Sequence, residues 1–209
     1  MPVIEAGPAA EVLASRLQES GREVSVWSVR SLQELARLDR ALYAAIADVP
    51  TPTLDEPIRL LSNSANYSSI WLLAAGALAI VGGRTGRRAA VAGVVAIGIT
   101  SAVVNQGVKR LYPRARPDRA AEEVPVQRYV RMPDSTSFPS GHSASGFAFA
   151  TAVGAYAPVL GAPLRFMAAA VAYSRVHTGV HYPGDAVIGS LIGASIGGLV
   201  AAFARRRFP

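Results

Sequence analysis

The stretch 174–185, SRVHTGVHYPGD, gathers ionisable side chains between two apolar runs. It contains Arg175, His177, His181 and Asp185. A carboxylate close to an imidazole fixes the tautomer of the ring and stabilises its cation, so Asp185 could prepare His181 as a nucleophile or base. Asp185 also follows Pro183 and Gly184 at the start of an apolar run, where helix capping alone would account for it.

A second stretch, FPSGHS, places Ser140, Gly141 and His142 directly before another apolar run. The free amide groups and the positive dipole end at the start of that helix form an anion site. A glycine there allows the backbone to come close to a ligand. Ser140 could instead be an ordinary N-cap, but capping does not explain the histidine beside it.

A third stretch, KRLYPRARP, carries Lys109 and Arg116 on either side of Pro113. Proline lacks an N–H and restricts the residue before it, so we expect a helix to end near Leu111. Lys109 would then lie on the last turn, where the helix dipole also favours a cation, and Arg116 in the loop beyond. Taken alone, this stretch indicates little.

A zinc site is the metal alternative, because His177 and His181 are four residues apart. No third ligand and no HExxH glutamate lie near them, so the sequence predicts no metal. The chain has no cysteine, which excludes disulfides and thiolate metal sites.

Hydropathy predicts how these stretches are positioned. The chain has 209 residues, of which 51% are hydrophobic and 17% charged, more apolar than an ordinary soluble domain. Five soluble helices this apolar would leave too little polar surface, so we expect an all-α polytopic membrane helical bundle with about five transmembrane helices. Gly189, Gly193 and Gly197 of the last run are spaced for close helix packing in lipid. The apolar runs are 67–83, 89–106, 143–161, 163–174 and 186–203.

The first 66 residues are expected to form a polar N-terminal region with amphipathic interfacial helices, before a membrane-embedded domain at 67–207. Residues 1–30 contain no apolar run long enough for a signal peptide or anchor. Residues 31–47 repeat leucine or isoleucine every three or four positions. This pattern suits a helix on the membrane surface, and it suits a helix packed against the bundle equally well.

Consecutive spans place alternate loops on the same side, so the loops 107–142 and 174–185 should lie on one face of the bundle. Three cations, a helix N-terminus and two histidines would then meet there. Such a group can neutralise a phosphate dianion, attack it and protonate the leaving oxygen. The net charge of +7 fits anionic lipid or a phosphate ligand as well as nucleic acid, and we expect no nucleic-acid partner.

Together the three stretches resemble the signature of the type 2 phosphatidic acid phosphatases, a family related to the vanadium haloperoxidases. That signature is Lys-x6-Arg-Pro, then Pro-Ser-Gly-His, then Ser-Arg-x5-His-x3-Asp, and all its specified residues are present. The resemblance covers about 68–205. It implies a metal-independent lipid phosphatase without a cofactor. His181 would form a phosphohistidine, Asp185 would orient it, and His142 would protonate the leaving oxygen. The implied substrate-binding residues are Lys109, Arg116, Ser140, Gly141 and Arg175.

The resemblance leaves several points open. A haloperoxidase would share the pocket but is soluble, which the apolar runs argue against. A non-enzymatic protein that binds or transports a lipid phosphate would also need the basic pocket. The expected partners are a lipid phosphate, on a polyprenyl or a glycerolipid, and the lipids of the cell membrane. Neither the individual substrate, nor the oligomeric state, nor the side of the membrane that the pocket faces follows from the sequence.

Overall fold

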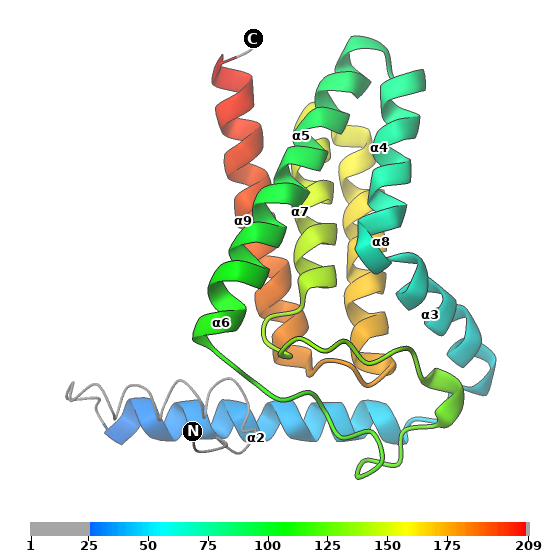
Figure 1. Ribbon diagram of the computed structural model, residues 1–209, viewed down its shortest axis with the longest axis vertical. Helices are drawn as coiled ribbons and strands as arrows, with labels where there is room; N and C mark the ends of the chain where they lie inside the picture. Colours follow the sequence, from blue (N-terminus) through cyan, green and yellow to red (C-terminus); the bar gives the residue numbers. More distant parts are fainter. Residues whose placement is uncertain (1–25, 208–209) are drawn as a thin grey trace.

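The computed structural model describes residues 26–207, and within them every regular element is a helix, which confirms the all-α prediction (Figure 1). Most of the segment 1–30, expected to be polar and without an anchor, lies outside the described residues. The long helices are α2 (Val26–Asp48), α3 (Pro52–Ser64), α4 (Ser69–Val81), α5 (Gly83–Ala102), α7 (Gly141–Tyr156), α8 (Pro158–His177) and α9 (Pro183–Arg207). The short ones are the 3₁₀ turns η1 (Asn66–Ser68) and η3 (Val126–Arg128), the π-helical η2 (Val103–Val108) and α6 (Lys109–Leu111).

The core of the bundle forms around α7, which packs against α5, α8 and α9 (Figure 1). Small side chains make this packing close. The α9 glycines that are spaced four apart face α7, and a Cβ atom at any of them would overlap a backbone carbonyl of α7 or of its N-cap Ser140. The predicted small-residue contact is therefore present, and it draws the first turn of α9 against the start of α7. Those glycines are Gly189, Gly193 and Gly197.

Each of the five apolar runs corresponds to one helix of the bundle, but the predicted boundary between the third and fourth runs was wrong. The third helix ends at Tyr156 and the fourth begins at Pro158, so the chain turns at Ala157 and not near residue 162. Pro158 starts the helix because its missing N–H has no helical partner at that position. Pro163, which the runs placed at the boundary, lies inside α8.

By length and composition, two helical stretches within residues 26–207 are apolar enough to cross a membrane: Gly83–Leu111, with mean hydropathy 1.7, and Pro183–Arg207, with 2.0. A third is possible if α3 and α4, bent by 64° at η1, count as one broken span. The helices α4 and α7 have 13 and 16 residues, fewer than the ~20 of a full span. The number of five membrane helices therefore stays a prediction.

The helix α2 lies across one end of the bundle (Figure 1). It packs on α8 and α9 through Tyr43 and Ala47, which are both buried. The leucine stripe lies on another face, where Leu35 and Leu38 are 59% and 54% exposed. Packing against the bundle thus explains the buried face of α2 but not its leucines, and the leucines fit a helix on the membrane surface.

The two loops that carry the predicted site lie at the same end of the bundle as α2 (Figure 1). The helix before the first of them ends at Leu111, as Pro113 predicts. The turn between α4 and α5 and the end of α9 lie at the opposite end. The predicted site residues therefore lie at one end of the bundle. Arginines near the α4–α5 turn and at the end of α9 lie at the other end: Arg84, Arg87, Arg88 and Arg205–Arg207.

Candidate active site

A pocket of about 270 Å³ opens at the α2 end of the bundle. Five of the eight predicted site residues line it: Lys109, Arg116, Gly141, His142 and His181. The other three predicted site residues do not line the pocket and are buried: Ser140, Arg175 and Asp185. The structure therefore brings together side chains from α6, α7, α8, α9 and the loops between them.

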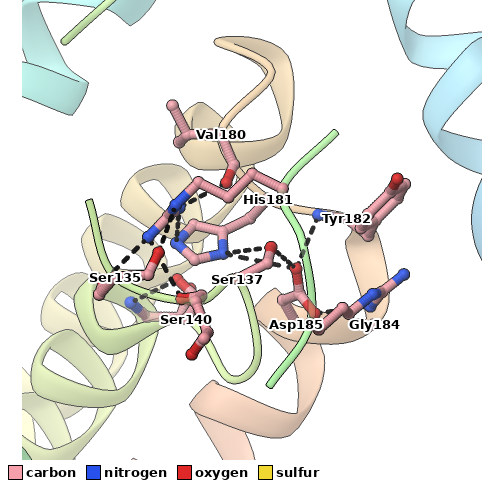
Figure 2. Close-up of polar contacts among 12 residues, drawn as sticks. Ser135, Ser137, Ser140, Val180, His181, Tyr182, Gly184 and Asp185 are labelled. Atoms are coloured by element: carbon pink, nitrogen blue, oxygen red, sulfur yellow. Dashed lines mark hydrogen bonds and ion pairs between the residues drawn. The ribbon is translucent and has the colours of Figure 1, made fainter. Parts of the chain in front are cut away.

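His181 lies between a cation and a carboxylate (Figure 2). Its Nε2 is 3.2 Å from a terminal nitrogen of Arg116, and its Nδ1 is 3.4 Å from Asp185 Oδ2 and 3.4 Å from Ser137 Oγ. A guanidinium only donates, so Nε2 of His181 must accept from Arg116, and a neutral ring carries its proton on Nδ1. The unprotonated nitrogen is the one beside the pocket-lining arginine.

The turn between α8 and α9 fixes the backbone of His181. The α8 helix ends at His177, and Gly179 takes the left-handed conformation, with φ of 68°, that glycine adopts without strain. The amides of Val180 and His181 then donate to the carbonyl of Arg175, at 3.1 and 3.2 Å. This turn, typical of helix C-termini, holds His181 at a set distance from the end of α8.

Asp185 is both a helix cap and a partner of the imidazole. It lies in the first turn of α9, and its Oδ2 accepts from the Tyr182 amide at 3.0 Å, as an acidic residue of a capping box does. The same oxygen accepts from Ser137 Oγ, and Oδ1 accepts from Arg114 at 2.6 Å. The capping alternative is therefore correct, and it does not exclude the orienting role, because the carboxylate makes both sets of contacts.

Arg114 extends this contact to α2. Its second terminal nitrogen donates to Asp39 of α2 at 2.8 Å, and its guanidinium lies 3.9 Å from the centre of the Tyr182 ring. Asp39 also accepts from the Gly184 amide at 2.6 Å. Arg114 is 2% exposed, so its charge is balanced almost entirely by Asp39 and Asp185.

We expect Arg114→Gln to lower the free energy of unfolding by about 3 kcal/mol, because removing one partner of a buried ion pair leaves an uncompensated charge. The variant should also lose activity, since Asp185 loses one of the groups that orient it. Thermal unfolding in detergent micelles measures the first effect. Arg110→Gln is the matched control, because Arg110 is exposed on the same stretch; an equal loss in both variants would contradict this account.

The pocket cations Lys109 and Arg116 both donate to Ser135, and Arg116 also donates to the turn between α8 and α9. Lys109 donates to Ser135 Oγ at 3.0 Å, and Arg116 donates to the backbone carbonyls of Ser135 at 2.9 Å and Val180 at 2.6 Å. Burial lowers the pKa of Arg116 to about 10, so it remains a cation at neutral pH. Arg175 donates to Ser62 Oγ at 2.7 Å, while its Nε is buried without a partner among residues 26–207.

The start of α7 carries the second histidine. Ser140 caps this helix, with its Oγ accepting from the Ser143 amide at 3.4 Å, which confirms the capping alternative for that residue. His142 Nε2 lies 3.0 Å from Asn66 Oδ1. An amide oxygen only accepts, so Nε2 of His142 donates to Asn66. Asn66 precedes the apolar runs and is a site neighbour that the sequence did not indicate.

Residues 89–209 match the PAP2 superfamily, and this match covers more than half of the chain. The chain belongs to the PAP2 superfamily.

Two mycobacterial enzymes are among the proteins with sequences similar to this PAP2 chain. The decaprenylphosphoryl-5-phosphoribose phosphatase of Mycobacterium tuberculosis is 34% identical over an alignment of 170 residues that covers 78% of this chain and 91% of that protein. The enzyme of the same name from Mycolicibacterium smegmatis is 35% identical over an alignment of 155 residues. This alignment covers 71% of this chain and 77% of that enzyme. These relatives are phosphatases by name, and the prediction that this PAP2 protein is a phosphatase is confirmed.

Two solved structures share the PAP2 fold. LpxE of Aquifex aeolicus has a TM-score of 0.65 and 24% identity, covering 79% of this chain and 95% of that one. The transmembrane PAP2 type phosphatidylglycerolphosphate phosphatase of Bacillus subtilis has a TM-score of 0.65 and 21% identity, covering 96% and 95%. The second structure is a transmembrane protein, and the predicted membrane helical bundle is confirmed as the fold.

The remaining histidine of this PAP2 chain, His177, lies outside the pocket. Its Nε2 is 3.0 Å from Asp55 Oδ1, which also accepts from Arg128 Nε at 2.9 Å. Arg128 further donates to backbone carbonyls at the end of α2, so this buried group ties α2 and α3 to the loop. No three histidine, aspartate or glutamate side chains within 26–207 gather in a way that could hold a metal ion.

We expect the pKa of His181, the candidate nucleophile of the PAP2 pocket, to lie far below that of an ordinary histidine. Burial lowers the pKa of His181 to about 4, partly opposed by its hydrogen bond with Asp185. Because the folded pKa lies below the usual 6.5, the ring is already neutral above pH 4 to 5 and stays so at neutral pH. We expect NMR of ¹³C-labelled histidine in micelles to give a midpoint below about pH 5. His181→Gln assigns the resonance, and a midpoint at 6.5 or above would contradict the geometry.

Proposed function

We propose that this PAP2 protein hydrolyses a phosphate ester or pyrophosphate of a membrane lipid through a phosphohistidine at His181, without a metal. One observation carries the proposal: the unprotonated Nε2 of His181 lies beside Arg116 in the pocket, with Asp185 on the opposite side of the ring. A nucleophile next to a fixed cation, with a carboxylate behind it, is the arrangement that nucleophilic catalysis on a phosphate dianion requires.

The reaction would take place in two steps. In the first, His181 Nε2 forms a bond to phosphorus, the bond from phosphorus to the leaving oxygen breaks, and that oxygen takes a proton from His142. Asp185 stabilises the charged phosphohistidine through Nδ1–H. In the second, water attacks the phosphorus, His142 takes the proton of the water, and inorganic phosphate leaves. His142 thus acts as an acid and then as a base.

Five further residues would hold the phosphoryl oxygens. Lys109 and Arg116 line the pocket as cations, and Arg175 has an Nε donor without a partner among the described residues. Ser140 and Gly141 begin α7, where backbone amides and the helix dipole favour an anion. Ser140 Oγ caps the helix, and the Ser140 amide donates to the Asp185 carbonyl at 2.9 Å. We therefore assign the contribution of Ser140 to holding the N-terminus of α7, and with it the Gly141 amide, in place for the phosphoryl oxygens.

We assign the substrate to the polyprenyl-phosphoryl sugar phosphates, because the mycobacterial relatives are named for decaprenylphosphoryl-5-phosphoribose. The alternatives are a polyprenyl pyrophosphate or a glycerolipid phosphate. The protein would work in the cell membrane as a multi-pass protein, with the five helices α4, α5, α7, α8 and α9 in the bilayer. The exposed leucines of α2 would lie at the membrane surface at the pocket end.

Phosphate release tests the proposal. Purified protein in micelles is given a polyprenyl-phosphoryl ribose 5-phosphate, farnesyl pyrophosphate and dioleoyl phosphatidic acid, and inorganic phosphate is measured over time. We expect release from the first at the highest kcat/KM and no release by His181→Gln. A protein that binds these lipids and releases no phosphate from any of them would be a carrier, and the proposal would be wrong.

We expect activity to survive chelation. The phosphate charge is balanced by Lys109, Arg116 and Arg175 in this mechanism, so millimolar EDTA should change kcat/KM by less than about twofold. The assay is run after dialysis against EDTA, with zinc and magnesium added back separately. Loss of activity with EDTA and recovery with either metal would refute a metal-independent mechanism.

A further inference from the structure

We propose that the pocket contains a subsite for the hydroxyl groups of a sugar that bears the scissile phosphate, formed by the α5–η2 face at Thr100, Ser101 and Asn105. This inference rests on the proposed function and deepens it, because it names the chemical group next to the phosphate and the residues that select it.

The first observation is a row of polar side chains on the same helix as Lys109. Ser101, Asn105 and Lys109 are four residues apart along the continuous helix Gly83–Leu111, and all three line the pocket. Residues with this spacing share one helix face. Lys109 stands at the phosphate end, so Asn105 and then Ser101 would face the part of the substrate just beyond the phosphate.

The second observation is an unpaired hydroxyl. Thr100 is 0% exposed, it lines the pocket, and its Oγ1 has no hydrogen-bond partner among the described residues. A buried hydroxyl without a partner destabilises a fold unless something else supplies the hydrogen bond. A substrate hydroxyl in the pocket would do so.

The amide of Asn105 has one side free for a ligand. Its Nδ2 donates to Ser101 Oγ at 3.1 Å, which leaves Oδ1 to accept a further hydrogen bond. Asn105 lies in the π-helical segment Val103–Val108. Segments of this kind are rare and often occur at functional sites, because the wider turn changes which side chains face the site.

Other residues that line the pocket are also polar or have an unusual backbone conformation. Ser145 lines it three residues after His142 on α7. Tyr67 and Ser68 also line it and have φ of 54° and 60°, unusual for residues other than glycine, and Tyr67 is 93% exposed. Local strain of this kind is retained where it positions a side chain for function.

These features favour a sugar over a hydrocarbon next to the phosphate. A prenyl or acyl chain attached directly to the phosphate would lie against Thr100, Ser101 and Asn105 and give them no hydrogen-bond partner. A sugar hydroxyl can donate and accept, so it can pair with the Thr100 hydroxyl and the Asn105 carbonyl together. A site that hydrogen-bonds a substrate hydroxyl discriminates strongly against analogues that lack it.

The test compares two substrates of equal chain length: an alkylphosphoryl ribose 5-phosphate and the alkyl phosphate without the sugar. The variants are Asn105→Leu and Thr100→Val. Gln106→Leu and Thr85→Val are the matched controls, because both residues are exposed on the same helix and neither lines the pocket. Melting temperature is measured for each variant.

We expect Asn105→Leu and Thr100→Val to lower kcat/KM about 10- to 100-fold on the sugar phosphate and less than about threefold on the alkyl phosphate. Thr100→Val should not lower the melting temperature, since it removes an unpaired hydroxyl. Equal losses on both substrates, or no loss on either, would overturn the proposed subsite. Phosphate release by the wild type in the same assay would still support the proposed phosphatase function. Absence of phosphate release by wild type from both substrates would overturn the proposed function and the subsite with it.

Discussion

Replacing His181 by glutamine should lower kcat by at least about 10⁴-fold on every phosphate substrate, because the variant has no nucleophile to form the covalent intermediate. Glutamine preserves much of the side-chain volume and can still hydrogen-bond, so the fold should be retained. The loss should not depend on the leaving group, since His181 attacks phosphorus whichever oxygen departs. Steady-state phosphate release measures it, with a lipid phosphate and with p-nitrophenyl phosphate.

His177→Gln is the matched control for this variant. His177 is also a buried histidine, and a glutamine amide can donate to Asp55 as its Nε2 does. The control should keep activity within about threefold of wild type. Comparable losses in the two variants would show that the effect of His181 comes from folding and would remove the basis for a nucleophilic role.

Replacing His142 by alanine should give a loss that depends on the leaving group. General acid catalysis is worth about 10²- to 10⁴-fold, so we expect a decrease of that size on a lipid phosphate, whose leaving oxygen needs a proton. On p-nitrophenyl phosphate the leaving group departs without protonation, and the decrease should be less than about tenfold. The measurement is the ratio of kcat/KM values for the two substrates in wild type and variant.

Asn66→Ala provides a graded comparison for His142. Asn66 holds Nε2 of His142 at 3.0 Å, so its loss should leave the acid present but poorly oriented. The Asn66 variant should lose activity on the lipid phosphate less than His142→Ala does, with the same dependence on the leaving group. Equal losses on both substrates in His142→Ala would mean that this residue binds phosphate and does not protonate the leaving oxygen.

The site could be predicted largely from local sequence patterns. The three stretches carry their chemistry within a few residues, and the alternation of spans predicts that their loops meet. The partners of these residues could not be predicted, because Asp39 pairs with Arg114 across 75 positions and Asn66 with His142 across 76. Arg114 lies within a recognised stretch, but nothing local distinguishes it from the neighbouring arginines.

The helices of the fold could also be predicted largely from the sequence. Hydropathy located five helices because apolar runs this long have few other structures available in a membrane protein. The boundary between α7 and α8 was misplaced because Ala157, Pro158 and Pro163 all lie in an apolar stretch, and hydropathy does not say which proline begins a helix. The packing of α2 could not be predicted either, since it uses Tyr43 and Ala47 and not the leucines.

Trapping the phosphoenzyme tests the central claim most directly. Protein is mixed with a substrate labelled with ³²P in the scissile phosphate, quenched in alkali within the first turnovers, and digested for peptide mapping. We expect an alkali-stable, acid-labile label on the peptide containing His181 in wild type and in His142→Ala with p-nitrophenyl phosphate, and none in His181→Gln. Label that persists in His181→Gln, or turnover by wild type without any labelled histidine, would contradict the mechanism.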